Sequence, residues 1–413
     1  MSQTRLLLVR RYYLACALTP LEAVLAPVVV LYYVDFLDKS FATYTAFLSL
    51  ILVMNLVLEV PLGMLSDRIG RAAALLVGNA VSIAALAATL FVSASWQLFA
   101  IAVALSFGQS LTSGNLQSIA FEVFSRAGVR DQFGRFLARN ASITILASAA
   151  AALVGGFLAD LSLALPMLAD IALAAVRLGI GIVVFVLLWG AASGAERSSA
   201  VPLRPDRLGA LAQIVDVVAV VRLPSFWAAA CAGAICFAVL RASLNFYQPF
   251  LASRDWSGSE IGILFSVAIV ASALLSRLLV QDGKEVTAQS TVCVLIAALV
   301  VSGLCFALAD VAIGFFLVAF ALHQMTRITV PSFATGAEQA SMPEGYPHRT
   351  TAASLSMALR SVVAVVAISV SGQLAAHMDH ALTLAALNIV GALLCGAVLL
   401  MFWRSQRPKG VKS

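Results

Sequence analysis

The sequence predicts an all-α polytopic membrane protein with twelve transmembrane helices in two groups of six. Apolar residues occupy 62% of the 413 positions and charged residues only 11%, whereas soluble globular chains are about one quarter charged. Because so few polar groups are present, most of the surface must face lipid. A bilayer core needs roughly 20 consecutive apolar residues per helix. The chain has twelve such runs, at about 12–34, 41–64, 72–93, 96–121, 139–160, 169–190, 224–252, 259–281, 287–308, 310–337, 350–373 and 381–403.

A long polar connection near the middle of the chain separates the two groups of six. It covers residues 191–223 and contains Pro202 and Pro205 among several arginines. We therefore expect an N-terminal six-helix bundle at 1–190, a central cytoplasmic loop at 191–223 and a C-terminal six-helix bundle at 224–413 that ends in a short basic cytoplasmic tail.

The distribution of basic residues predicts the orientation. With twelve spans, the loops and tails on the N-terminal side hold twenty Lys and Arg residues, whereas the opposite side holds only Lys39 and Arg254. Because positively charged loops resist translocation, we expect both termini in the cytoplasm and a multi-pass protein of the inner (plasma) membrane. The net charge of +6 thus reflects topology, and it predicts no nucleic-acid partner.

The segment between the second and third apolar runs carries the most specific motif. Residues 63–71 read Gly-Met-Leu-Ser-Asp-Arg-Ile-Gly-Arg. This pattern resembles the signature loop of the major facilitator superfamily of transporters, in which Gly-x-Leu-x-Asp-Arg-x-Gly-Arg joins helices two and three. The resemblance implies two pseudo-symmetric six-helix bundles that alternate access to a site between them.

In that family the loop latches the inner gate, although the same charges are also suited simply to anchoring it at the interface. In the loop, glycines permit close approach and a tight turn, and the charged side chains are suited to helix ends and ion pairs. Glu122 with Arg126, at the inner end of span four, is the predicted partner of the loop. The expected gating residues are Gly63, Asp67, Arg68, Gly70, Arg71, Glu122 and Arg126.

Glu22 is the acid predicted nearest the membrane midplane. It lies eleven residues beyond Arg11, which is roughly 16 Å at the rise of a helix. Pro20 and Pro27 flank it and loosen the backbone hydrogen bonds around it, as in discontinuous transporter helices. Because charged groups in the hydrocarbon region indicate function, Glu22 is the candidate proton-coupling residue. A role as a fixed counter-ion remains an alternative.

The resemblance places spans one, four, seven and ten around the central cavity. Two or three arginines facing one acid predict a positive cavity that selects anionic or zwitterionic cargo. Structural roles remain open for Arg241 and Arg360, and a hydrogen-bonded packing role for His323. Arg177 is expected to pair with Asp170, seven residues earlier. The candidate substrate-binding residues are Glu22, Gln109, Asn115, Arg241, Asn245, Tyr247, Gln248, His323, Arg327 and Arg360.

Other kinds of chemistry have no counterpart in the sequence. The six cysteines all lie in apolar runs without metal-ligand spacing, so we expect neither disulfides nor a metal site. A phosphate-binding glycine-rich loop and a clustered catalytic constellation are both missing from the sequence. We therefore expect no cofactor and no enzymatic activity. The expected partners are a small-molecule substrate, protons and the lipid bilayer, with the protein functional as a monomer.

These observations predict a secondary active transporter. Proton-coupled export of an anionic or zwitterionic amphipathic metabolite, chelator or drug is the leading interpretation, and a proton symporter for uptake of an organic acid or other metabolite is the alternative. Short patches such as Glu59-Val60-Pro61 resemble bacterial efflux-type members related to drug–proton antiporters. The chain departs from them in span four, where 104–109 lacks an Arg, and in span five, where 151–156 keeps only the last two residues of Gly-Pro-x-x-Gly-Gly.

Overall fold

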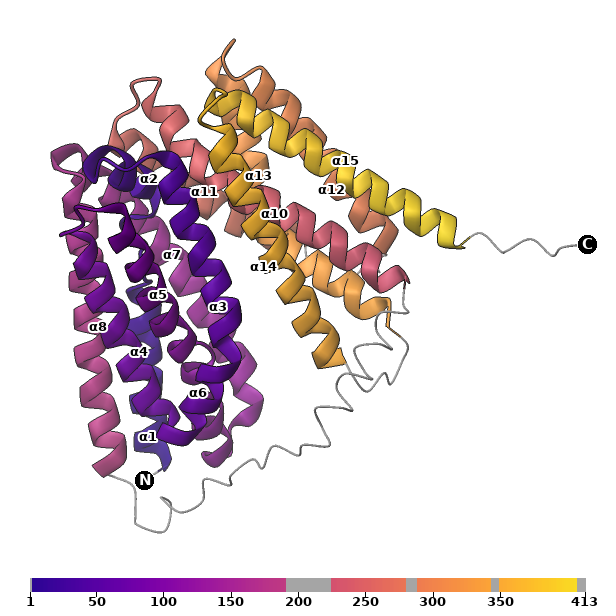
Figure 1. Ribbon diagram of the computed structural model, residues 1–413. Helices are drawn as coiled ribbons and strands as arrows, with labels where there is room; N and C mark the ends of the chain where they lie inside the picture. Colours follow the sequence, from indigo (N-terminus) through magenta and orange to yellow (C-terminus); the bar gives the residue numbers. More distant parts are fainter. Residues whose placement is uncertain (1, 191–223, 280–287, 343–348, 407–413) are drawn as a thin grey trace, which may run out of the picture. The chain divides into compact units, whose positions relative to one another are not determined.

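The computed structural model describes residues 2–190, 224–279, 288–342 and 349–406, and throughout these ranges the regular structure is helical (Figure 1). The elements are α1 (Ser2–Leu18), η1 (Ala26–Val28), α2 (Val29–Leu31), η2 (Tyr32–Phe36), α3 (Phe41–Ile69), α4 (Arg71–Thr89), α5 (Ser95–Thr112), α6 (Asn115–Arg126), η3 (Arg130–Gln132), α7 (Phe133–Leu161), α8 (Ala164–Gly190), α10 (Pro224–Ala252), α11 (Gly258–Leu279), α12 (Ala288–Ala307), α13 (Ile313–Ala340), α14 (Arg349–Leu374) and α15 (His380–Gln406).

Each of the twelve predicted spans coincides with helical structure. Ten of them correspond to one α-helix each, from α3 to α15, whereas spans one and four are each divided. Within the described residues, seven helices are long and apolar enough to cross a membrane, and three shorter helical segments are also apolar. The all-α, polytopic fold class is therefore confirmed.

The two divided spans break at different kinds of sequence. Span four bends between α5 and α6 at Ser113 and Gly114, where Gly114 adopts a φ of +69° that suits a residue without a Cβ. Span one is interrupted between Leu18 and Ala26, around Pro20. The interruption confirms the loosened backbone expected between Pro20 and Pro27.

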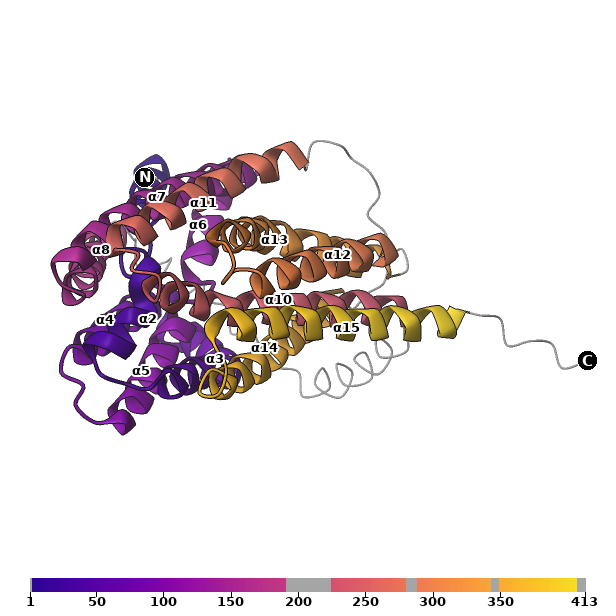
Figure 2. The same ribbon diagram turned by 90° about the horizontal axis from the view of Figure 1, so that it is seen from above.

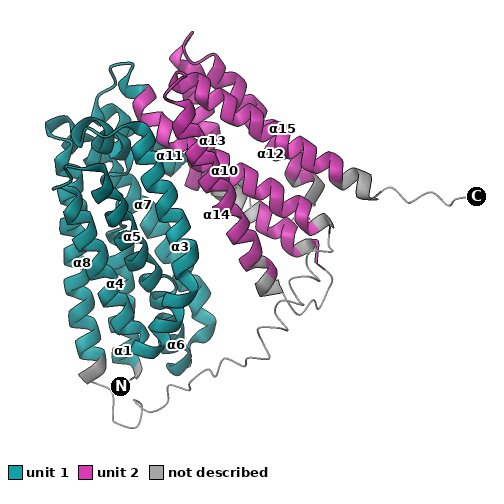
Figure 3. Ribbon diagram, in the orientation of Figure 1, with its two compact units in different colours: residues 1–202, 251–271 teal, residues 203–250, 272–413 magenta. Residues whose placement is uncertain are grey.

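The chain forms two compact units, coloured separately in Figure 3. Unit 1 comprises residues 1–202 and 251–271, and unit 2 comprises residues 203–250 and 272–413. The segment 251–271, which includes the first part of α11, thus groups with the N-terminal helices. The domain limits expected from the sequence stay a prediction, and the expected central loop at 191–223 lies outside the described residues.

Within unit 1, α7 packs closely against the start of α11 through glycines. A Cβ added to Gly156 would lie 2.8 Å from Gly262 Cα, which is closer than real Cβ atoms approach. Asp160, one turn further along α7, accepts hydrogen bonds from Ser259 N at 3.2 Å and so satisfies a free amide at the start of α11. Gly156 thus permits close packing of α7 against α11.

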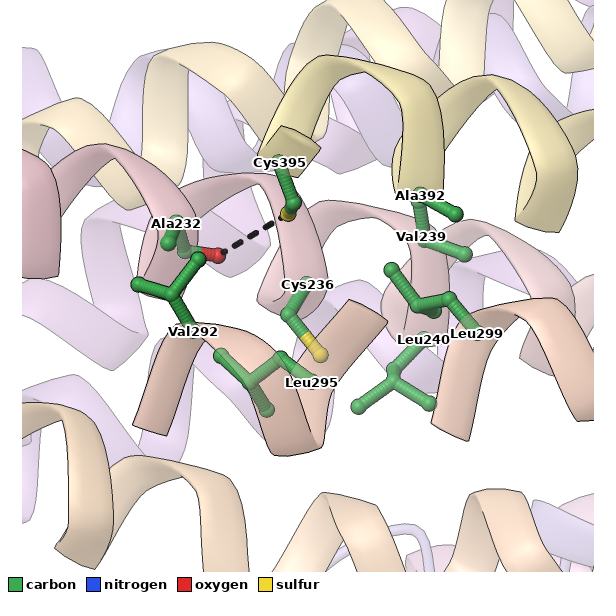
Figure 4. Close-up of a cluster of buried hydrophobic side chains, with 9 residues drawn as sticks. All are labelled: Ala232, Cys236, Val239, Leu240, Val292, Leu295, Leu299, Ala392 and Cys395. Atoms are coloured by element: carbon green, nitrogen blue, oxygen red, sulfur yellow. Dashed lines mark hydrogen bonds between the residues drawn. The ribbon is translucent and has the colours of Figure 1, made fainter. Parts of the chain in front are cut away.

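Within unit 2, α10, α12 and α15 share an apolar core. Figure 2 shows these helices from above, and Figure 4 shows the side chains that α10, α12 and α15 contribute. Two cysteines belong to this core, and the Cys395 thiol is 3.9 Å from Ala232 O; all six cysteines of the chain are free. The core consists of Ala232, Cys236, Val239, Leu240, Val292, Leu295, Leu299, Ala392 and Cys395.

Candidate functional site

The interruption of the first span exposes backbone amides that a side chain from another helix satisfies. Asp170 on α8 accepts hydrogen bonds from Val24 N at 3.2 Å and from Leu25 N at 2.8 Å. The Asp170 side chain is buried, with 3% of the residue exposed. Because unpaired amides inside a membrane protein are costly, Asp170 holds the interruption in one conformation. We call Glu22, Val24, Leu25 and Asp170 the break site.

Glu22 lies at the break site in an unusual backbone conformation. Its φ is +55°, a region that L-residues other than Asn, Asp and Gly seldom adopt. Its side chain is exposed, unlike those of Val24 and Leu25. A strained, exposed carboxylate within a membrane span is the arrangement expected of a functional group.

A glycine on α7 makes room for the break site. A Cβ added to Gly155 would collide with Val24 O, so the backbone of the interrupted span lies directly against α7. The interrupted segment is therefore held on one side by Asp170 and on the other by the bare backbone at Gly155.

The sequence interpretation misjudged the surroundings of Asp170. It did not foresee a second acid at the break site, where Asp170 binds the amides two and three residues after Glu22. Arg177 does not pair with Asp170. It is buried and donates instead to Asn79 Oδ1 on α4, at 2.8 Å. The seven-residue spacing placed Arg177 and Asp170 on one face of α8, but their partners come from α4 and from the interrupted span.

Gln109 and Asn115 lie at separate places in unit 1. Gln109 accepts a hydrogen bond from Asn55 Nδ2 at 3.0 Å and lines a small cavity of about 170 Å³ together with Asn55 and Glu59. Asn115 is buried and accepts from Ser66 Oγ at 2.9 Å, which ties the start of α6 to the end of α3. Asn55 is a polar residue that the sequence interpretation missed.

Unit 2 brings two of the candidate arginines together. Arg241 on α10 and Arg327 on α13 are both exposed, and they are close enough for the charge of one to act on the other. Among the residues that the structure describes, neither guanidinium forms an ion pair with a carboxylate. Two neighbouring cations without a counter-ion form a positive surface that fits carboxylate or phosphate groups.

Tyr247 and His323 face each other in the interior of unit 2. The Tyr247 hydroxyl hydrogen-bonds His323 Nδ1, and His323 Nε2 is 2.8 Å from Asn388 Oδ1 on α15. Phe306, Phe316 and Phe320 surround the Tyr247 ring. Because only 1% of Tyr247 and 3% of His323 are exposed, this arrangement fits the packing alternative for His323. Asn245 and Gln248 are also buried.

Arg360 forms a buried ion pair that the sequence interpretation did not foresee. Its Nη2 donates to Glu338 Oε1 at 2.7 Å, and the same oxygen accepts from Ser356 Oγ at 2.7 Å. The side chains of Arg360 and Glu338 are 8% and 3% exposed. Glu338 lies at the end of α13, one residue beyond the apolar run of span ten, so the sequence pattern does not mark it as an intramembrane charge.

The signature loop consists of a single residue between two helices. Gly70 joins α3 to α4 with a φ of +94°, which confirms that the turn needs glycine. Gly63 instead lies within α3, and a Cβ added there would meet nothing within 4 Å. The expected role of Gly63 in close helix approach is not observed in this structure.

The charges of the loop pair locally: Arg71 at the start of α4 binds Asp67 at the end of α3, and Arg126 binds Glu122 within α6. Arg71 Nε donates to Asp67 Oδ1 at 3.3 Å, and Arg126 Nη2 donates to Glu122 Oε1 at 2.5 Å. Arg71 and Glu122 nevertheless line the same cavity of about 610 Å³. The expected latch partners therefore lie around one cavity, without an ion pair between them among the described residues.

Comparison with known proteins places the whole chain in one structural class. Residues 14–367 match the family model described as Major Facilitator Superfamily. A solved variant of the nucleoside transporter NupG aligns with a TM-score of 0.74 at 13% identity, covering 98% of this chain and 100% of its own. A POT family transporter in complex with a thioalcohol-conjugated peptide aligns with a TM-score of 0.65 at 12% identity, covering 97% of this chain and 96% of its own. No curated protein sequence matches the chain significantly.

Proposed function

The chain belongs to the major facilitator superfamily, and from this premise we propose that it couples proton movement to the export of a small anionic or zwitterionic amphipathic molecule. Membership makes it a membrane transporter rather than an enzyme. Metabolites, chelators and drugs that carry carboxylates fit the proposal. The efflux-type subfamily, the inner membrane and the cytoplasmic position of both termini are parts of the same proposal, as is function as a monomer.

The pair of exposed arginines in unit 2 is the observation that supports a negatively charged cargo group. Arg241 and Arg327 repel each other electrostatically, and an anion between or beside them relieves that repulsion. A guanidinium presents a planar fork that binds carboxylate or phosphate with two hydrogen bonds. A cationic cargo would raise the repulsion, so this pair favours anions and zwitterions.

The break site supplies the coupling residue of the proposal. Glu22 is an exposed carboxylate at an interruption in a membrane helix, and it lies near a second carboxylate that is already fixed by two amides. Because Asp170 is occupied by the backbone, Glu22 is the carboxylate to which we assign proton coupling. Protonation of Glu22 would remove one of two neighbouring negative charges. The proposal is that the free energy of this protonation differs between the two states of the transporter.

The alternative is a proton symporter for uptake of an organic acid or other metabolite. It uses the same arginines and the same carboxylate, and differs in the direction of the proton relative to the cargo. NupG and the POT proteins share the fold at 12–13% identity, which is too distant for their cargo to be transferred to this chain.

Thermal unfolding with candidate ligands identifies the cargo class. A bound ligand raises the unfolding temperature according to its concentration over its dissociation constant. We expect anionic or zwitterionic compounds to stabilise the wild-type protein and to lose this effect in Arg327→Ala. Arg254→Ala, in the short turn before α11, is the matched control and is expected to behave as wild type. Stabilisation by lipophilic cations in both variants would contradict the proposed cargo class.

Proteoliposomes then test the coupling. With a compound found in the ligand panel, we expect an imposed pH gradient to accelerate wild-type transport, and Glu22→Gln to remove the dependence on the gradient. Glu260→Gln replaces an exposed carboxylate that binds Ser257 N at the start of α11 and is expected to keep the dependence. If Glu22→Gln transports with the pH dependence of the wild type, Glu22 is not the coupling residue. If cargo moves in the same direction as protons, the result supports the symporter alternative.

A further inference from the structure

A positively charged cavity lies in unit 1, apart from the residues of the break site. It has a volume of about 530 Å³ and is formed by α1, η3 and the first part of α7. Helix α1, which carries Arg10 and Leu14 of this cavity, runs from the N-terminus of the chain (Figure 1). The distribution of arginines predicts that the N-terminus is cytoplasmic. The cavity is lined by Arg10, Leu14, Asp131, Gln132, Arg135, Phe136, Arg139, Asn140 and Ile143.

The polar part of this cavity has an excess of positive charge. Three arginines face one acid, Asp131. Arg135 and Arg139 are exposed, and among the described residues they form no ion pair. Both therefore present guanidinium groups that are open to an anion from outside the protein.

Arg10 on α1 is held in place by two contacts. Its guanidinium lies 5.0 Å from the centre of the Phe124 ring and donates to Gln132 Oε1 at 3.3 Å. The Arg10 Nε is buried without a hydrogen-bond partner. A fixed guanidinium with a donor to spare is preorganised for an acceptor such as a phosphate oxygen.

The same cavity becomes apolar one helical turn further into the predicted membrane. Leu14 follows Arg10 by four residues on α1, and Ile143 follows Arg139 by four residues on α7. Four residues correspond to about 6 Å along a helix. Tyr13 and Phe136 pack edge to face at 5.0 Å, which holds α1 against α7. The cavity thus offers cations at its outer part and aliphatic side chains below them.

From this arrangement we infer that the cavity binds an anionic phospholipid, with the headgroup phosphate among Arg10, Arg135 and Arg139 and an acyl chain against Leu14 and Ile143. A phosphate and its hydrocarbon chain have the same order along the membrane normal as the cations and aliphatic residues of the cavity. The negative surface potential of the cytoplasmic leaflet adds to the attraction. A soluble phosphate would use the arginines but would leave the aliphatic part of the cavity without a partner.

Native mass spectrometry of the full-length protein in detergent measures this binding directly. The probes are dioleoylphosphatidylglycerol, dioleoylphosphatidylcholine and, for the soluble arm, glycerol 3-phosphate. Each basic residue near an anionic lipid surface contributes about 1 kcal/mol, so Arg135→Gln with Arg139→Gln is expected to weaken phosphatidylglycerol binding about 30-fold. Binding of phosphatidylcholine is expected to stay weak and unchanged.

Two further variants separate charge from shape. Lys39→Gln with Arg254→Gln removes the same two charges at the predicted outer face, and we expect it to bind phosphatidylglycerol as the wild type does. Ile143→Trp fills the aliphatic part of the cavity without changing charge, and we expect it to weaken phosphatidylglycerol binding several-fold. The proposal is overturned if the arginine variants bind phosphatidylglycerol like the wild type, or if phosphatidylcholine binds equally well. Glycerol 3-phosphate binding as tightly as the lipid would reassign the cavity to a soluble anion.

Discussion

The carboxylate of Asp170 caps the interruption of the first span by accepting from Leu25 N at 2.8 Å, and its other oxygen accepts from Val24 N at 3.2 Å. Helix α8 therefore supplies the hydrogen bonds that the first span gives up between α1 and η1. The geometry of Glu22 depends on this contact, because Glu22 lies only two residues before Val24.

Replacing Asp170 is expected to destabilise the protein in proportion to the hydrogen bonds lost. Asp170→Ala leaves two buried amides unsatisfied, at about 1–3 kcal/mol each, whereas Asp170→Asn keeps one acceptor oxygen. We expect the unfolding temperature to fall from wild type to Asn and further to Ala. Asp160→Ala is the control, because Asp160 also accepts from a backbone amide but is exposed, and it should cost less than either. Equal stability of Asp170→Ala and wild type would show that the amides find other partners.

Glycine at position 22 is expected to separate backbone strain from the carboxylate. A φ of +55° costs an L-residue about 1 kcal/mol relative to glycine. Glu22→Gly should therefore be more stable than Glu22→Ala by about that amount, although both lose the carboxylate and with it the proposed proton coupling. Chemical or thermal unfolding in detergent measures the difference. An alanine variant as stable as the glycine variant would mean that the segment relaxes to a negative φ without cost.

Alanine at position 155 is expected to displace the interrupted segment. The added Cβ would collide with Val24 O, and backbone cannot move aside as a flexible side chain can. Gly134→Ala on the same helix is the matched control, because a Cβ there would meet nothing within 4 Å and alanine favours helix by up to about 1 kcal/mol. We expect a lower unfolding temperature and slower transport for Gly155→Ala, with neither effect for Gly134→Ala. The reverse order would contradict the packing of α7 against the break site.

Two ion pairs with the same chemistry are expected to differ in energy because of burial. Breaking a buried pair costs about 3–5 kcal/mol, so Glu338→Gln should strongly destabilise unit 2 by leaving Arg360 without its partner. Glu122→Gln breaks an exposed pair, in which the side chain of Glu122 is 49% exposed and that of Arg126 is 50% exposed. This variant should lose under about 1 kcal/mol of stability.

A double replacement checks the cause of that loss. Glu338→Leu with Arg360→Met removes both buried charges, and a buried pair is often replaced by apolar residues at little cost. We expect the double variant to recover much of the stability lost in Glu338→Gln. If the double variant is less stable than Glu338→Gln, the ion pair itself stabilises the protein, beyond the cost that it avoids of leaving one buried charge unpaired.

The sequence predicted the helices well and the partners of the polar residues less well. Twenty apolar residues in a row have few structures open to them in lipid, so the spans follow from composition alone. The prolines around Glu22 likewise indicated the interruption, because proline removes a backbone donor. These signals are local in the sequence, so they can be interpreted without knowing which helices pack together.

The roles of Asp170 and Glu338 depend on helices that are distant in the sequence. Asp170 lies 146 residues after Val24, and spacing along α8 suggested Arg177 as its partner instead. Glu338 lies one residue outside the apolar run of span ten, so the sequence pattern does not connect it with Arg360. Arg241 and Arg327 are both exposed, whereas the positive cavity around them and their contact with cargo stay predictions.

The one-residue connection at Gly70 has a consequence for biosynthesis. Only Gly70 connects α3 to α4. The connection is therefore too short for one helix to lie in the bilayer while the other remains in water. We therefore expect α3 and α4 to insert into the membrane as one unit. Arg68 and Arg71 flank the connection between them, and basic residues resist transfer across the membrane, so the predicted topology keeps this connection on the cytoplasmic side throughout insertion.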